Sequence, residues 1–376
     1  MRSEHHILTH CTPGTTRQLV SLHFGDASRG PKALIQASLH ADEPPGLLVA
    51  YHLRRELAAL ESEHRIHGEI VLVPMANPVG SAQRLLGRAL GRFELAGGEN
   101  FNRNYADLSD AIFSSLRAEI DAGHTPTVSA VRAALRAASL QLPAHSELQC
   151  LRKTLLRLAI DADLVLDLHC DNEAVLHLYT ATPVWPAVEP LARLLGAEVA
   201  LLAEESGGDP FDEACSMLWT RLRRRYREHT GKEAAWPDAC VAVTVELRGE
   251  TDVCHDLAQR DARAILAWLT HRGMIDAALP EMPPLIRQPR PLEGSVPVLT
   301  PRGGVLVHRP LLGQMVRQGQ CIAEVIDPLS GESSELVSAV DGLLYARESV
   351  RTVHAGMSIA KVAGLDAIRI GHLLSA

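Results

Sequence analysis

Apolar, β-branched runs alternate with longer segments of helical periodicity over residues 15–275 of the chain. Such runs predict strands, and apolar residues that recur every three or four positions predict amphipathic helices. We expect strands within 14–39, 68–80, 162–169, 173–180, 197–205 and 239–249, and helices at 45–59, 184–196, 212–229 and 255–274. Strands that alternate with helices in this order predict a parallel sheet covered by helices. Residues 106–160, rich in alanine, leucine and arginine, predict a largely helical insertion.

The chain changes character at a proline-rich stretch, residues 279–294, which we take as the boundary between two domains. The predicted domains are residues 1–288 and 289–376. In the second domain, short apolar runs follow turn glycines, and "GVLV" at Gly304 is echoed by "GLLY" at Gly342. A two-fold repeat of short strands predicts a small β-sandwich or barrel.

Composition narrows the class of protein. A net charge of −8 and a pI of about 6.1 do not indicate nucleic-acid binding. The N-terminal segment, in which we expect His5 and His6 to be unstructured, lacks the apolar core of a signal peptide. Because no run of about 18 apolar residues follows either, we expect a cytoplasmic protein without a membrane partner. The seven cysteines are isolated, which argues against a disulfide framework or a cysteine-based zinc site. The sequence leaves open whether the chain forms a homo-oligomer.

Polar side chains follow two of the predicted strands at the points where these strands end. His40 and Glu43 follow one apolar run, and Asp167 and His169 close another. Sites in open parallel sheets form at the carboxyl ends of the strands, so two imidazoles and a carboxylate there match a catalytic zinc site of the His₂Glu kind. Taken alone, His40 and Glu43 are better explained as an ordinary loop histidine and a helix-start carboxylate, because H-x-x-E is common by chance. Asp167 is either a group that orients a ligating imidazole or a polar strand end, and both interpretations stay open.

A hydrolytic site also needs a base and groups that donate hydrogen bonds. Glu246 ends another apolar strand, where a carboxylate is unfavourable unless it is solvated in a cleft or paired, so we take it as the candidate base. The alternative is a salt bridge between Glu246 and Arg248. Asn102 and Arg103 lie in the loop "GGENFNRNY", and Arg103 can bind a carboxylate through two hydrogen bonds. Arg92 is a second candidate cation, able to polarise a carbonyl group.

The order of these motifs resembles the succinylglutamate desuccinylase/aspartoacylase branch of the zinc carboxypeptidase fold. An H-x-x-E at a strand end, an N-R in a loop, a D-L-H at a strand end and a late strand-end glutamate occur in that order over residues 15–275. The segments "NFNRNY", "DLHCDNEAVLHLYT" and "EESGGDPFDEACS" resemble deacylase members of that branch. The resemblance implies an α/β fold with a zinc-carboxypeptidase-like mixed sheet flanked by helices, followed by a C-terminal β-rich, barrel-sandwich-like domain.

The resemblance also implies a function and a set of roles. We expect a zinc-dependent amidohydrolase, a deacylase that hydrolyses the amide bond of a small N-acyl amino acid or a related acidic amide. The alternatives are a metallocarboxypeptidase that acts on short peptides and a metal-binding regulatory protein that has lost catalysis. By this resemblance, His40, Glu43 and His169 bind one Zn²⁺ per chain, and Glu246 acts as general base and then acid toward the zinc-bound water. Arg92 donates to the oxyanion. Asn102 and Arg103 bind the carboxylate of the substrate.

The insertion departs from the family, and the tail has a second resemblance. The helical insertion at 106–160 is a departure from the best-known members, so the acyl group and the amino acid are left open. The tail also resembles a biotinyl or lipoyl domain, but the segment between its two halves contains no lysine that could carry such a group. We therefore expect the tail to be a structural or capping module.

Overall fold

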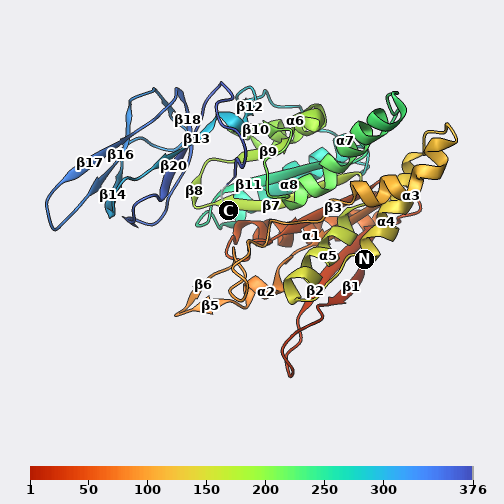
Figure 1. Cartoon of the computed structure of the whole chain (residues 1–376). Helices are drawn as coiled ribbons and strands as arrows, with labels where there is room; N and C mark the ends of the chain where they lie inside the picture. The colour runs from red at the N-terminus through yellow and green to blue at the C-terminus, as the bar shows by residue number, and fades with distance from the viewer. Residues whose placement is uncertain (375–376) are drawn as a thin grey trace.

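The computed structural model describes residues 1–374, and the larger part of the chain is built on a nine-stranded sheet (Figure 1). The strands are β1 (Arg2–Ile7), β2 (Gln18–Gly25), β3 (Lys32–Ala37), β4 (Glu69–Val73), β7 (Leu164–Asp171), β9 (His177–Ala181), β10 (Val199–Ala203), β11 (Val241–Gly249) and β12 (Arg290–Pro291). They lie in the order β1-β2-β4-β3-β7-β11-β9-β10-β12. The neighbours of β3 and β7 run parallel to them, whereas β1/β2, β2/β4 and β9/β11 are antiparallel pairs. The sheet is therefore mixed, with a parallel centre.

Helices cover both faces of this sheet. The helices are α1 (Pro45–Ser62), α3 (Ser109–Asp121), α4 (Val128–Leu140), α5 (Glu147–Ala159), α6 (Trp185–Leu195), α7 (Phe211–Thr230) and α8 (His255–His271), with a single turn, α2, at Pro78–Ser81. One face packs α1, α6 and α8 against side chains such as Ile35, and the other packs α3, α4, α5 and α7 against side chains such as Leu34. Because successive strand residues point to opposite faces, burial on both faces requires continuous apolar runs. The predicted α/β architecture is confirmed, and the helical insertion consists of α3, α4 and α5.

The three central strands position the candidate site. The strands β3, β7 and β11 are parallel neighbours, so their carboxyl ends lie along one edge of the sheet. Ala37 of β3 lies opposite Leu168 of β7, and His169 lies opposite Glu246 of β11. The chain leaves β3 at Ser38, whose positive φ of 64° turns it out of the strand just before His40.

The C-terminal part is rich in short strands, as expected. They are β13 (Ser295–Leu299), β14 (Gly304–His308), β15 (Met315–Val316), β16 (Cys321–Ile326), β17 (Ser333–Val337), β18 (Gly342–Arg347), β19 (Thr352–Val353) and β20 (Ser358–Ala363). One sheet has the order β13-β20-β18-β15 and the other β17-β16-β14-β19. The sequence repeat corresponds to β14–β16 and β18–β20, and its copies exchange short strands, since β15 pairs with β18 and β19 with β14.

Two strand pairings join this β-rich region to the rest of the chain. The short strand β8 (Glu173–Ala174) pairs with β18, and β12 extends the nine-stranded sheet by pairing with β10. Figure 1 accordingly shows the β-rich region, in blue, at the edge of the sheet that carries β10 and β12. The domain boundary at 288/289 stays a prediction.

Two local expectations were wrong. His5 and His6 are not unstructured but belong to β1, which pairs with β2, and the His6 imidazole lies 2.8 Å from the hydroxyl of Ser21. The run 173–180 is not one strand either, since it divides into β8 and β9 where the chain crosses from the β-rich region to the large sheet. Among residues 1–374, every helix is too short or too polar to cross a membrane.

Candidate active site

Two strand ends bring together His40, Glu43 and His169, the three residues predicted as metal ligands. The Nδ1 atoms of His40 and His169 lie 2.8 Å from Oε1 and Oε2 of Glu43, respectively. The two imidazole rings meet edge to face with their centroids 4.8 Å apart. One ligand atom from each residue can be chosen so that all lie within 4.8 Å of one another, and all three side chains are buried. The predicted convergence is confirmed, and this cluster could hold a metal ion.

The far nitrogen of each imidazole faces an acceptor. The Nε2 atom of His40 lies 2.9 Å from Oδ1 of Asn100, and that of His169 lies 2.9 Å from Oδ2 of Asp167. The other oxygen of Asp167 accepts a hydrogen bond of 3.0 Å from Gln36. Because acceptors at Nε2 favour a proton there, they leave the Nδ1 lone pairs facing Glu43 and available to a metal. Asp167 therefore lies where a group that orients His169 is required.

The charges of the cluster depend on one another. Burial alone would raise the pKa of Glu43, but the imidazoles of His40 and His169 hold it well below its usual range. Burial opposes protonation of His169 in the same way, yet Asp167 and Glu43 raise its pKa well above the usual value. Glu43 also accepts a 3.1 Å hydrogen bond from the backbone N–H of Cys170. The site is thus built to hold positive charge between carboxylates, which is the electrostatic requirement of a cation site.

Glu246 lies on β11 directly opposite His169 and lines the same cavity. Its buried Oε2 atom has no hydrogen-bond partner among the described residues. Burial, followed by the negative charge of Glu43, raises the pKa of Glu246 to about 8. The alternative interpretation, a salt bridge with Arg248, does not hold because Arg248 pairs with Asp261. A buried carboxylate of raised pKa beside a cation site has the properties of a group that exchanges protons.

Arg92 reaches the cluster from the loop that follows the β-hairpin of β5 (Arg84–Leu85) and β6 (Arg88–Ala89). Its Nη2 atom lies 2.8 Å from Oε1 of Glu43. The preceding Gly91 accounts for this close approach, since its carbonyl accepts the N–H of Ala41 at 3.0 Å. A Cβ atom at Gly91 would lie 2.2 Å from the backbone nitrogen of Asp42, so this position has room only for glycine.

Asn102 and Arg103 line the cavity on the side of α7. The Oδ1 atom of Asn102 accepts a 2.9 Å hydrogen bond from the backbone of Phe211, and its Nδ2 atom lies 3.5 Å from Nε2 of His169. Arg103 donates to the carbonyl of Asn102 at 2.7 Å. It packs on Gly208, whose φ is +82° and where a Cβ atom would lie 2.9 Å from Cδ of Arg103. An amide N–H and a guanidinium are thus presented side by side, which suits a carboxylate.

Two carboxylates stand at the start of α7 near Arg103. Asp212 and Glu213 both line the cavity, and Glu213 accepts the N–H of Ser206 at 2.7 Å. Burial raises the pKa of Asp212 to about 6 and that of Glu213 to about 7. These carboxylates balance part of the charge of Arg103, which limits how many anionic groups this side of the cavity accepts.

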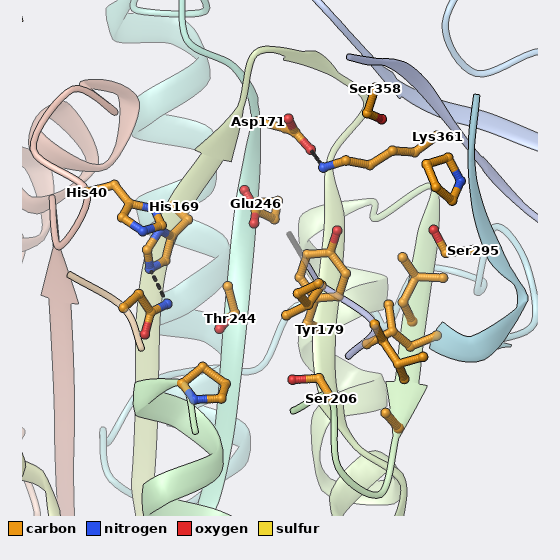
Figure 2. Close-up of a pocket in the computed structure, with 18 of the residues that line it drawn as sticks. His40, His169, Asp171, Tyr179, Ser206, Thr244, Glu246, Ser295, Ser358 and Lys361 are labelled. Atoms are coloured by element: carbon orange, nitrogen blue, oxygen red, sulfur yellow. Dashed lines mark hydrogen bonds and ion pairs between the residues drawn. The ribbon is translucent and has the colours of Figure 1, made fainter. Parts of the chain in front are cut away.

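All of these groups open into one cavity of about 550 Å³ (Figure 2). Figure 2 shows the His40 and His169 imidazoles at one side, Glu246 and Tyr179 in the middle, and Ser295 and Lys361 at the other side. Lys361 of β20 forms an ion pair of 2.5 Å with Asp171 of β7. The cavity is therefore lined by both parts of the chain.

A comparison with models of protein families shows to which family the chain belongs. The model of the succinylglutamate desuccinylase/aspartoacylase catalytic domain matches residues 29–272. The chain belongs to this family. Members of the family that carry those names are hydrolases, and no curated protein matches the chain.

Solved structures of the same family share the fold over nearly the whole chain. A succinylglutamate desuccinylase/aspartoacylase family protein from Shewanella amazonensis is 26% identical, covers 96% of this chain and 98% of its own, and has a TM-score of 0.82. Another from Shewanella frigidimarina is 24% identical, with 96% and 97% covered and a TM-score of 0.81. The product-bound ectoine utilization protein EutE (DoeB) from Ruegeria pomeroyi is 18% identical, with 96% and 95% covered and a TM-score of 0.66. The last two show a likeness of fold alone.

Several residues in and behind the cavity of this family member were not predicted. Asn100 and Gln36 support the cluster and adjoin predicted motifs, so strand alternation and the "ENFNRNY" loop could have indicated them. Tyr345, Ser295 and Lys361 come from the β-rich region, and no motif marks them. The expectation that the tail only caps the structure was incomplete, because its side chains form one wall of the cavity.

Proposed function

We propose that this chain is a zinc-dependent amidohydrolase that splits the amide bond of a small N-acyl amino acid. The observation that carries the proposal is the convergence of His40, Glu43 and His169 beside Glu246, at the carboxyl ends of three adjacent strands. Family membership supports hydrolysis as the reaction class.

The donor set fits zinc. Two imidazole nitrogens and one carboxylate are the protein ligands of many catalytic zinc ions, and they leave a coordination position open for a reactant. His40, Glu43 and His169 would hold the ion, and Asn100 and Asp167 would fix the imidazoles. When bound, zinc supplies a Lewis acid that polarises the carbonyl of the amide.

The neighbouring residues supply the remaining chemistry. Glu246 takes a proton from the attacking water and returns it to the leaving amine, a role for which its unpartnered Oε2 atom is available. Arg92, which reaches to within 2.8 Å of Glu43, donates hydrogen bonds to the carbonyl oxygen as negative charge develops there.

The carboxylate of the substrate binds between Asn102 and Arg103. The amide N–H and the guanidinium lie on one side of the cavity, so a carboxylate held there places the adjacent amide near the metal cluster. A cavity of about 550 Å³ closed on one side by the β-rich region suits a small molecule better than a peptide chain.

A metal-dependence experiment tests the proposal. We expect chelation to abolish release of amine from N-acyl amino acids and zinc to restore it. Glu246→Gln should lower kcat by about 10²- to 10⁴-fold while zinc stays bound. The matched control is Glu69→Gln, since Glu69 is another buried glutamate that contacts a histidine, His23, but lies outside this cavity. Activity that survives chelation, or a Glu246→Gln variant as active as wild type, would contradict the mechanism.

The same assay separates the other candidate functions. Faster hydrolysis of short peptides than of N-acyl amino acids would favour a carboxypeptidase. Stoichiometric zinc without hydrolysis of any amide would favour a metal-binding regulatory protein.

A further inference from the structure

The cavity extends well beyond the groups that the proposed reaction uses. Its volume of about 550 Å³ lies in the range, roughly 300–1,000 Å³, of cavities that enclose drug-sized ligands. The reacting groups stand at one side, and Figure 2 shows Tyr179 between the imidazoles and Ser295. The space beyond Tyr179 is therefore available to a part of the ligand other than the scissile amide.

The wall of this space is apolar. We call it the apolar end and define it by Leu201 and Ala203 of β10, Leu292 of the 3₁₀ turn Leu292–Gly294, and Leu373 of the C-terminal segment. These four side chains belong to one hydrophobic cluster that also contains Tyr179. Each is at least nine-tenths buried among its neighbours, so it offers a ligand the small apolar part of its surface that faces the cavity.

The polar groups next to the apolar end already have partners. Lys361 pairs with Asp171 at 2.5 Å, and the hydroxyl of Tyr345 lies 2.7 Å from that of Ser295. Arg369 donates to the carbonyl of Ser295 at 2.8 Å. At the apolar end itself, a second carboxylate on the substrate, such as that of a succinyl group, would meet leucine side chains, which is unfavourable. The cations beside it are Lys361, already paired with Asp171, and Arg369, whose guanidinium donates to backbone carbonyls.

A segment near the C-terminus closes this end. The backbone N–H of Leu373 donates to the carbonyl of Ser206 at 2.8 Å, which ties the segment to the loop beside Arg103. The apolar end and the metal cluster lie in one cavity, so a single molecule can reach both.

We propose that the apolar end binds an apolar substituent of the substrate, carried either by its acyl group or by its amino-acid side chain. This inference rests on the proposed amidohydrolase function and narrows it to N-acyl amino acids with one carboxylate and one apolar group. Each methylene moved from water into such a wall strengthens binding by roughly fourfold when it is fully buried.

The test compares two substrate series on the full-length, zinc-loaded chain. The first series lengthens the acyl group on glycine from acetyl to butanoyl and hexanoyl, with succinyl as the acidic member. The second keeps acetyl and changes the amino acid from glycine to leucine and phenylalanine. We expect kcat/KM to rise by at least about tenfold along one series, which identifies the apolar group, with succinylglycine the poorest acyl substrate. Flat or falling values in both series, or succinylglycine as the best substrate, would overturn the inference and leave the amidohydrolase function intact.

Two variants show where in the cavity the preference for the larger substrate arises. Ala203→Phe fills the apolar end and should remove the advantage of the larger substrate, measured as the ratio of its kcat/KM to that of acetylglycine in the same variant. Leu299→Asp places a charge at the opening, where Leu299 lines the cavity and is 54% exposed, so the variant should fold. Leu329→Asp is the matched control, since Leu329 is 97% exposed and lies outside the cavity. An unchanged preference for the larger substrate over acetylglycine in both Ala203→Phe and Leu299→Asp would overturn the assignment of the apolar end.

A binding measurement keeps the inference separate from the function. Calorimetric titration with hexanoate, acetate and succinate needs no turnover. If no amide is hydrolysed, the proposed function fails, and tighter binding of hexanoate that is lost in Ala203→Phe would still support the apolar end. Equal binding of the three acids would overturn it.

Discussion

The Asp167→Asn substitution tests whether the groups behind the imidazoles control the metal site. Asp167 is fully buried, and its oxygens lie 2.9 Å from Nε2 of His169 and 3.0 Å from Nε2 of Gln36. The substitution replaces a carboxylate by an amide of the same shape. It removes the negative charge behind His169 without opening a cavity, so the change in metal affinity reports on that charge.

The expected loss of zinc affinity follows from these contacts. A hydrogen bond to a charged group contributes about 1.5–3 kcal/mol and a neutral one about 1 kcal/mol, so losing the charge weakens the interaction with His169 by roughly 1–2 kcal/mol. Gln36 has an unpartnered Oε1 atom and can turn its amide to accept from the new Nδ2 group. The turned amide keeps its contact with residue 167 and places its Nε2 group where Oε1 now has no partner, and we expect zinc affinity to fall by about tenfold. Asp167→Ala leaves the Nε2–H of His169 unpaired, and its loss should approach about a hundredfold.

The assay is competition for zinc between the protein and a fluorescent chelator at constant pH, together with urea unfolding of the metal-free protein. Asp261→Asn is the control, because Asp261 is also a fully buried aspartate but pairs with Arg248 away from the cavity. The control should lose stability and keep its zinc affinity. Zinc affinities of Asp167→Asn and Asp167→Ala within twofold of wild type would refute the role of Asp167.

Three further predictions concern the surroundings of the site. Gly91→Ala should lower kcat/KM by at least about tenfold, because overpacking of about 1–3 kcal/mol at a Cβ position 2.2 Å from Asp42 must displace Arg92; steady-state kinetics measures this. Burial lowers the pKa of His177 to about 4, so the unfolded state binds the proton first as the pH falls. The free energy of unfolding should therefore fall by about 3 kcal/mol between pH 6.5 and pH 4. Urea unfolding of wild type and His177→Phe at several pH values measures this change. Lys361→Met should destabilise the fold by about 2 kcal/mol by leaving the Asp171 carboxylate unpaired at a partly solvated position, which unfolding also measures.

Each of these has its own control. For Gly91→Ala, the substitution Gly87→Ala in the nearby hairpin meets no atom within 4 Å, and equal losses in both would contradict the steric argument. For His177, wild type and His177→Phe with parallel stability curves between pH 4 and 6.5 would show that its pKa is not lowered. For Lys361, the double variant Lys361→Met/Asp171→Asn should regain most of the lost stability, and failure to do so would argue for a packing defect instead.

The convergence of His40, Glu43 and His169 could be predicted from the sequence because it depends on where strands end. His40, His169 and Glu246 each follow or close an apolar run, and parallel neighbours bring their carboxyl ends to one edge. The far side could not be predicted in this way. Lys361 meets Asp171 only because β18 pairs with β8, a contact between segments far apart in the chain that leaves no periodic signal in either. The position of His6 in β1 was missed for a related reason, since an edge strand with one solvated face needs little apolar sequence.

The pairing of β8 with β18 and of β12 with β10 has a consequence for how this family diversifies. The residues proposed for the reaction all precede position 247, whereas much of the opposite wall comes from residues after 291. Inherited changes in the tail can alter which molecule fits without touching the atoms that react. The backbone ladders at β8 and β10 keep the two walls in register while such changes accumulate, so relatives with one chemistry can come to serve different metabolites. Exchange of the tail between two relatives, with the junction placed outside both ladders, is accordingly a route to transfer substrate preference.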